Sequence, residues 1–337
     1  MYTPQQLVVQ AERALESCEP QLAIKFVRRA LELQAAADAG GAAGAAGAAG
    51  GELPVTSDAR VFQLLGSAYV ELVNTVTADT PDAIDVPQVM EAAREAFLMA
   101  VKLAPGVDSV KYLSLGQLSV SKEAIGYYET GVRLLMAEIE ALPNGPQSEQ
   151  AQILRNKLGS ALCSMTEIYM TDCCDEPEAE SKCEAYMHHA VEQNPSNPEV
   201  HQTLASVRLS QSRPDDARQS LEYAMDLWYR EPTEDEPLVA DPNWPGYPLR
   251  IALSKFLMEV GLHERALAVL QTCQVEDDED AEMWYLFGWC YSQLAASQPE
   301  LAEDARECFE TVKTLDKMYP GSVDPEILQH IAELVSA

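Results

Sequence analysis

The chain is short of basic residues and histidine, and it lacks long apolar runs. Its five His residues leave little material for general-base catalysis. The patterns G-x4-G-K-[ST], H-E-x-x-H and G-x-S-x-G do not occur, nor does the glycine pattern of dinucleotide-binding folds. We therefore expect a protein that is not an enzyme and that needs no cofactor.

The sequence also lacks targeting and disulfide signals. No stretch approaches the ~20 apolar residues of a membrane-spanning helix, and the first residues lack the basic-then-apolar layout of a signal peptide. We expect a soluble protein made inside the cell. Cys183, Cys273, Cys290 and Cys308 lie at apolar positions, which is typical of a reducing compartment. The Cys and His residues between positions 173 and 189 lack zinc-site spacing, so no metal is predicted.

Segment 283–320 carries the pattern W-x2-L-G-x2-Y, then A-x3-F, then a closing Pro, which marks a helix-turn-helix repeat. The matching residues are Trp284, Phe287, Gly288, Tyr291, Ala305, Phe309 and Pro320. Glycine lets two helices approach closely, and the aromatic side chains fill the space around it. The segment resembles a tetratricopeptide repeat.

Further copies are expected, because one such unit cannot bury its apolar face alone. The spacing predicts seven units, at residues 4–34, 58–105, 106–142, 149–195, 197–230, 248–274 and 280–320. A polar-faced capping helix is predicted at 324–336, and a flexible Ala/Gly connector at 35–51. The predicted fold class is all-α: a right-handed superhelical solenoid of about seven tetratricopeptide repeats with a C-terminal capping helix, forming one domain over 1–337.

Acidic residues dominate the charge. Asp and Glu number 54 against 23 Lys and Arg, a formal charge of −31. Such a field repels nucleic acid and anionic membranes and attracts a basic protein segment, so the latter is the expected partner. Runs of acid are often no more than solvated loops, but the excess over the whole chain favours a cationic ligand. The acidic-loop residues are Glu234, Asp235, Glu236, Asp277, Asp278, Glu279 and Asp280.

The resemblance to the repeat class implies that the first helix of each unit lines a concave groove. The implied protein-binding residues are Glu71, Asn156, Glu199, Gln202, Glu259, Glu282, Tyr285 and Trp289. The same positions select Gln63 and Ser67 in the predicted repeat at 58–105. Carboxylates there would pair with Lys and Arg, and the two aromatic rings would stack on guanidinium groups. The alternative is that Tyr285 or Trp289 packs against the next unit.

The block from Trp244 to Ile251 (WPGYPLRI), with segments 256–262, 275–280 and 283–289, is similar to the fungal family of dedicated assembly chaperones for large-subunit ribosomal protein L-four. The resemblance implies a chaperone that binds newly made L-four and shields its basic, rRNA-binding internal loop until delivery to pre-60S ribosomes.

We therefore expect a location in both cytoplasm and nucleus. The chain has no basic cluster suited to nuclear import, so import receptors would act through the client. The alternative function is a scaffold or co-chaperone subunit of a multiprotein complex. The co-chaperone alternative is weakened because the groove offers Gln, Ser and carboxylates rather than the Lys, Arg and Asn that bind acidic chaperone tails.

Overall fold

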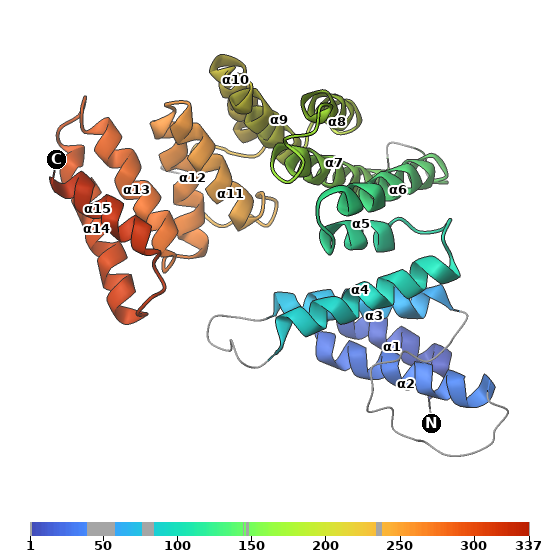
Figure 1. Cartoon of the computed structure of the whole chain (residues 1–337). Coiled ribbons are helices and arrows are strands. Elements are labelled where there is room, and N and C mark those ends of the chain that lie inside the picture. The colour runs from blue at the N-terminus through green and yellow to red at the C-terminus, as the bar shows by residue number, and fades with distance from the viewer. Residues whose placement is uncertain are drawn as a thin grey trace. The chain divides into compact units, whose positions relative to one another are not determined.

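The computed structural model describes residues 2–38, 58–75, 84–143, 145, 148–233 and 238–336. Over these ranges the regular elements are all α-helices (Figure 1). The chain divides into two compact units, Met1–Ala179 and Glu180–Ala337. Among the described residues, none of the helices is both long and apolar enough to cross a lipid bilayer.

The first unit is built from helices that pack in the order in which they follow one another. These are α1 (Pro4–Glu16), α2 (Pro20–Asp38), α3 (Ala59–Asn74), α4 (Val86–Leu103), α5 (Val110–Gln117), α6 (Ser121–Glu140) and α7 (Glu149–Met170). Helices α1 and α2, α3 and α4, and α5 and α6 form hairpins, and α7 packs on α6. Figure 1 shows α3 and α4 side by side above α1 and α2.

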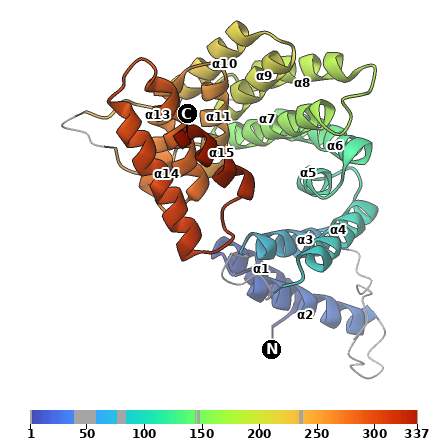
Figure 2. The same ribbon diagram turned by 60° about the vertical axis from the view of Figure 1, so that its left-hand side comes forward.

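The second unit repeats this arrangement. Its helices are α8 (Ala179–Gln193), α9 (Pro198–Ser210), α10 (Pro214–Asp226), α11 (Tyr247–Glu259), α12 (His263–Glu276), α13 (Ala281–Leu294), α14 (Leu301–Met318) and α15 (Pro325–Ser336). Hairpins form from α9 and α10, from α11 and α12, and from α13 and α14. Helix α15 packs on α13 and α14, beside which it lies in both Figure 1 and Figure 2.

The aromatic and glycine positions of the repeat pattern meet where helices of a hairpin cross. A Cβ atom on Gly288 would lie 2.4 Å from the Phe309 ring, and one on Gly66 would lie 2.8 Å from the Phe97 ring. Only glycine fits under such rings without a shift of the neighbouring helix. The sequence pattern thus marks the closest contacts of the helix pairs.

Helix ends follow local signals in the sequence. Ser148 caps α7, because its hydroxyl accepts a hydrogen bond from the Ala151 N–H at 3.2 Å. Helix α10 begins at Pro214, as expected for a residue whose missing N–H costs nothing in the first turn. At the start of the chain, Thr3 and Gln6 form a reciprocal capping box at α1.

The predicted connector at 35–51 begins too early. Helix α2 continues to Asp38, so residues 35–38 are helical. Three of these four residues are Ala, the best helix former, which favours continuation of the helix. The rest of the predicted connector lies outside the described residues.

The helix pairs overlap the predicted repeats, although α2 continues past residue 34 to Asp38 and α12 past residue 274 to Glu276. Helix α5, in the predicted repeat at 106–142, spans only 8 residues. Helix α15 lies in the segment predicted as a capping helix. The repeat at 149–195 extends across both compact units. That repeat and the continuous solenoid over 1–337 stay predictions.

Candidate binding site

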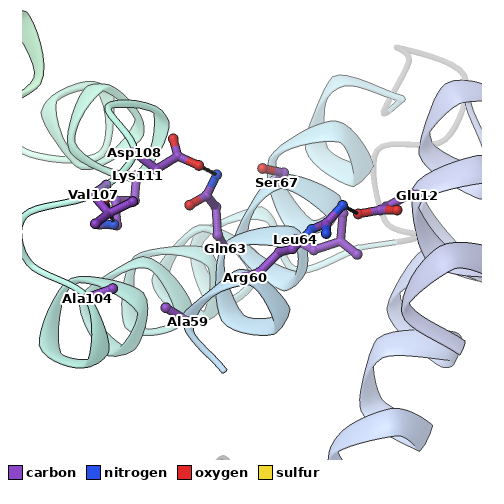
Figure 3. A pocket seen from close by; sticks show the side chains of 10 residues that line it. All are labelled: Glu12, Ala59, Arg60, Gln63, Leu64, Ser67, Ala104, Val107, Asp108 and Lys111. Atoms are coloured by element: carbon purple, nitrogen blue, oxygen red, sulfur yellow. Dashed lines mark hydrogen bonds and ion pairs between the residues drawn. The ribbon is translucent and has the colours of Figure 1, made fainter. Parts of the chain in front are cut away.

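In the first unit, two of the implied groove residues line a hollow of about 290 Å³. Figure 3 shows Gln63 and Ser67 of α3 facing this hollow, with Asp108 and Lys111 on one side and Glu12 of α1 on the other. The Gln63 amide donates to Asp108 Oδ2 at 2.8 Å. Arg60 and Glu12 form an ion pair on the α1 side of the hollow.

Lys111 is the unusual residue of this hollow, because its side chain is 1% exposed. Its ammonium group donates to the Val107 carbonyl, and burial lowers its pKa, against the opposing effect of Asp108 and Glu138. The hollow therefore holds two carboxylates and two cations and is not strongly acidic. Such a surface suits hydrogen bonds to polypeptide backbone and amide groups better than capture of a lone cation.

Acidic character lies farther along α3. Glu71 follows Ser67 by one helical turn and is exposed. No ion pair to its carboxylate is found among the described residues. On α7, the implied residue Asn156 is also exposed, and its Oδ1 accepts a hydrogen bond from Gln152 at 3.1 Å. Besides Gln63 and Ser67, the first unit thus presents one acidic and one further amide side chain at the positions implied by the repeat class.

Gln202 on α9 does not present its side chain to a ligand. It is 4% exposed, and its amide donates to the Leu249 carbonyl of α11 at 3.2 Å. This hydrogen bond joins two neighbouring helices, so the implied binding role of Gln202 is corrected to a packing role. Glu199, in the first turn of the same helix, is half-buried and its N–H donates to the Asn197 cap.

Helices α11 and α13 place the other implied carboxylates. Glu282 forms an ion pair with Lys255 at 2.6 Å, with both side chains nearly half exposed. Glu259 lies one turn beyond Lys255 on α11, is exposed, and has no ion-pair partner within the described ranges. Of these two carboxylates, Glu259 is therefore the more available to a cationic ligand.

The aromatic pair on α13 packs against the C-terminal helix. The Tyr285 hydroxyl and His330 Nδ1 of α15 are hydrogen-bonded at 2.7 Å, and the Trp289 ring meets the His330 ring edge-on with centroids 5.3 Å apart. Tyr285 and Trp289 nevertheless stay only half-buried. Packing on a neighbouring helix was the alternative stated for these rings, and it describes their contacts in this structure.

The acidic loop before α13 has a structural role. Asp280 caps α13 by accepting from the Glu282 N–H and also accepts from the Tyr247 hydroxyl at 2.6 Å. Burial and this carboxylate raise the pKa of Tyr247. The Asp278 carbonyl accepts from the Trp284 indole at 2.7 Å. Asp277 accepts a hydrogen bond from the Glu279 N–H. The four acidic residues 277–280 therefore stabilise the turn in addition to giving it negative charge. Residues 234–236, the other predicted acidic loop, lie outside the described residues.

Sequence reasoning missed Arg250, the most buried charged side chain among the described residues of the second unit. It is 1% exposed and donates to the Pro245 carbonyl at 2.8 Å and to Thr272 Oγ1 at 3.0 Å, and it pairs with Glu276. Its guanidinium group also lies over the Trp244 ring, 5.3 Å from the centroid. The segment WPGYPLRI is therefore held in place by its own arginine. The sequence did contain a hint that Arg250 is buried, because its neighbours in the chain are apolar and aromatic. Helical periodicity alone does not reveal such a buried charge.

Three buried thiols of the second unit are held in the protonated form. Burial raises the pKa of Cys290 and of Cys308 to about 12, and that of Cys273 to about 11. Within the part of the chain that the structure describes, no group of three or more His, Cys, Asp or Glu side chains could hold a metal ion. What the described surface offers is carboxylates, amides and aromatic rings, which are groups that bind peptides.

Known proteins similar to this chain share its sequence over most of its length, although no family model matches it. A protein of Schizosaccharomyces pombe named probable assembly chaperone of rpl4 is 34% identical over 245 residues, which are 72% of this chain and 66% of that protein. A protein of the same name from Emericella nidulans is 37% identical over 233 residues, 65% of this chain and 53% of that protein. The chain thus spans about two thirds of one relative and about half of the other.

Solved structures define the class of fold. A tetratricopeptide repeat protein from Parabacteroides merdae superposes with a TM-score of 0.51 at 11% identity, with 99% of each chain covered. Residues 1–338 of the assembly chaperone of RpL4 (Acl4) superpose with a TM-score of 0.68 at 29% identity, covering 89% of this chain and 99% of that one. The chain is a tetratricopeptide-repeat protein, as predicted. It belongs to the family of the assembly chaperones of rpl4, which confirms the resemblance seen in the sequence.

Proposed function

We propose that this protein is a dedicated, non-enzymatic chaperone that binds newly made ribosomal protein L4 and keeps it soluble until it joins the pre-60S ribosome. The observation that carries the proposal is the 34–37% identity to two proteins named as assembly chaperones of rpl4. The bound segment is the long, basic internal loop that L4 later places on rRNA.

Charge supports this choice of segment. A loop rich in Arg and Lys is extended and prone to aggregation before rRNA neutralises it. A chain with a formal charge of −31 attracts such a loop and repels rRNA itself. The exposed carboxylates of Glu71 and Glu259 would contribute to this attraction, and the polar hollow beside Gln63 would take backbone groups. Release then follows when rRNA, with its higher charge density, competes for the loop.

The protein would act in both cytoplasm and nucleus, since L4 is made in the first and assembled in the second. Import receptors would engage the basic client rather than the acidic chaperone. Depletion of L4 should then shift a fluorescently tagged chaperone to the cytoplasm. A nuclear level that is unchanged without L4 would contradict import through the client.

The functional test is suppression of aggregation. Denatured L4 diluted into buffer should scatter less light when an equimolar amount of this protein is present. The same protein should give little protection to an L4 variant that lacks the internal loop but retains the rest of the chain. Equal protection of both clients would exclude the loop as the bound segment, and no protection of either would favour a scaffold function.

A further inference from the structure

A second hollow in the C-terminal unit is lined by residues of α12, α13 and α14. Figure 1 shows the ribbon of α13 between those of α12 and α14. The volume of the hollow is about 270 Å³. The floor is formed by Trp284, Phe287 and Tyr291, and the rim includes Gln271 of α12 and Asp304 and Glu307 of α14. We call this hollow the α12–α14 pocket.

The α12–α14 pocket is not part of the implied groove. Helix α13 turns by about 100° per residue, so Trp284, Phe287 and Tyr291 share one face. Tyr285 and Trp289 lie on a face centred roughly 150° away around the same helix. A ligand on the Tyr285 face therefore leaves the α12–α14 pocket open.

The floor of the pocket is a fixed aromatic surface. The rings of Phe287 and Tyr291 are stacked, with centroids 6.2 Å apart and planes 16° from parallel. The Trp284 and Phe287 rings lie 5.8 Å apart, and the Trp284 indole is anchored to the Asp278 carbonyl. Trp284 and Tyr291 remain half-buried, so parts of their rings face the hollow. Such a surface binds a flat cation by stacking without first losing side-chain freedom.

The carboxylates at the rim lack cationic partners. Asp304 and Glu307 are both exposed, and neither forms an ion pair with any residue that the structure describes. Their neighbours on the same helix differ, because Glu303 pairs with Arg306 at 2.8 Å and Glu310 pairs with Lys313 at 2.8 Å. Of the four acidic residues between positions 303 and 310, the two that border the pocket are thus the two without an ion-pair partner.

We propose that the α12–α14 pocket binds an arginine side chain of a basic partner protein. The guanidinium group would stack on the aromatic floor while its N–H groups donate to Asp304 and Glu307. Arginine fits better than lysine, because a planar guanidinium both stacks and donates two hydrogen bonds at once. The identity of that partner as L4 rests on the proposed function, whereas the arginine chemistry does not. A client that contacts both faces of α13 would bind the implied groove through its loop and the α12–α14 pocket through a separate arginine.

The first test uses the indole N–H signals of the four Trp residues in the NMR spectrum of the full chain, assigned with Trp284→Phe and Trp289→Phe variants. The probe is a (Gly-Arg)4 peptide, compared with (Gly-Lys)4 and (Gly-Ser)4. The Trp284 signal should shift on titration with the Arg peptide, less with the Lys peptide and not with the Ser peptide. An Arg peptide that shifts only the Trp289 signal, on the other face of α13, would overturn the proposal.

The second test compares two charge reversals on α14. Asp304→Lys with Glu307→Lys removes the rim carboxylates, while Glu303→Lys with Glu310→Lys makes the same charge change outside the pocket. The rim variant should bind L4 about tenfold more weakly than the wild type, the loss expected for charge-assisted hydrogen bonds and stacking. The control should lose far less.

The outcomes separate the two proposals. Equal losses for both variants would contradict the α12–α14 pocket and leave the L4 function standing. If the wild type does not bind L4 at all, the proposed function fails, and the peptide titration alone decides whether the pocket recognises arginine. A normal circular dichroism spectrum of each variant shows that the helices are intact.

Discussion

The helix hairpins of this protein solve one packing problem in two ways. In α3–α4 and α13–α14, the crossing point pairs a glycine with an aromatic ring, Gly66 with Phe97 and Gly288 with Phe309. In α9–α10, a buried Ala205 stands at the glycine position, and the matching residue on the second helix is the smaller Leu221. Relative to the glycine–phenylalanine pairs, the first helix of α9–α10 has a larger side chain at the crossing and the second helix has a smaller one. Size complementarity at the crossing is therefore what a repeat must keep.

Hairpin α11–α12 combines aliphatic packing at the crossing with a buried polar contact between its helices. Its glycine position is the buried Ser254, and its second helix offers Leu270. Arg250 then links α11 to Thr272 and Glu276 of α12. In this hairpin, which has no ring packed on a glycine, a buried guanidinium group connects the two helices. The comparison predicts that different substitutions will break different hairpins.

The largest effect is expected from Arg250→Ala. The substitution removes hydrogen bonds to Pro245, Thr272 and Glu276 and leaves a cavity beneath Trp244. We expect a loss of about 3 kcal/mol in the free energy of unfolding, at the low end for a broken buried pair, because Glu276 is 48% exposed and can be hydrated. Hydrogen exchange of the α11 and α12 backbone amides measures this loss of stability. Arg265→Ala, which breaks the exposed pair with Asp226, is the control and should cost under about 1 kcal/mol. Equal costs would show that Arg250 does not lock this hairpin.

Next comes Gly288→Ala in the α13–α14 hairpin. Alanine favours helix by about 1 kcal/mol over glycine, but its methyl group would overlap the Phe309 ring. We expect a net loss of about 1–3 kcal/mol, measured by urea unfolding. Adding Phe309→Leu should recover part of that loss, because it converts this hairpin to the glycine-free solution of α9–α10. A double variant whose loss equals the sum of the single losses would contradict size complementarity.

A smaller effect concerns the exposed sides of α11 and α13. Glu259→Lys and Glu282→Lys should each weaken binding of a basic client, and more at low salt than at high salt. Glu259 should matter more, by several-fold, because Glu282 is already neutralised by Lys255 at 2.6 Å. Calorimetric titration with L4 at two salt concentrations measures both. A larger loss for Glu282→Lys would contradict this ranking.

The smallest expected effect is a histidine-dependent loss of stability at low pH. It is confined to the second unit, because the first unit contains no His. Burial lowers the pKa of His201, whose Nε2 lies 2.7 Å from the Pro195 carbonyl. The unfolded chain therefore binds more protons than the folded one as pH falls below about 6.5, so α9–α10 loses stability on acidification. Hydrogen exchange at pH 7 and pH 5 should show this loss in the wild type. His201→Gln should reduce it, and an undiminished loss would assign it to other groups.

The sequence predicted those features of the fold that depend on residues close together in the chain. The W-x2-L-G-x2-Y spacing located the helices and the crossing residues, because side chains three or four apart share a helix face. Acid excess and the WPGYPLRI segment identified the family. Helix bounds were less certain, as the continuation of α2 through Ala-rich residues to Asp38 shows.

The site was harder to predict, because it depends on which neighbour covers each face. Spacing placed Gln202, Tyr285 and Trp289 on the first helices of their repeats. It could not show that Gln202 bonds to Leu249 or that His330 packs on both aromatic rings. Nor could it show that Arg250 is buried. These contacts join residues about 40 to 50 positions apart, or bridge two helices, and helical periodicity carries no information at that range.

The most direct measurement of the central claim is the affinity of this protein for L4 and for L4 without its internal loop, each at low and high salt. Binding to intact L4 should be tight, should depend on the internal loop and should weaken as salt rises. Binding that is unchanged by loop removal and by salt would contradict the central claim.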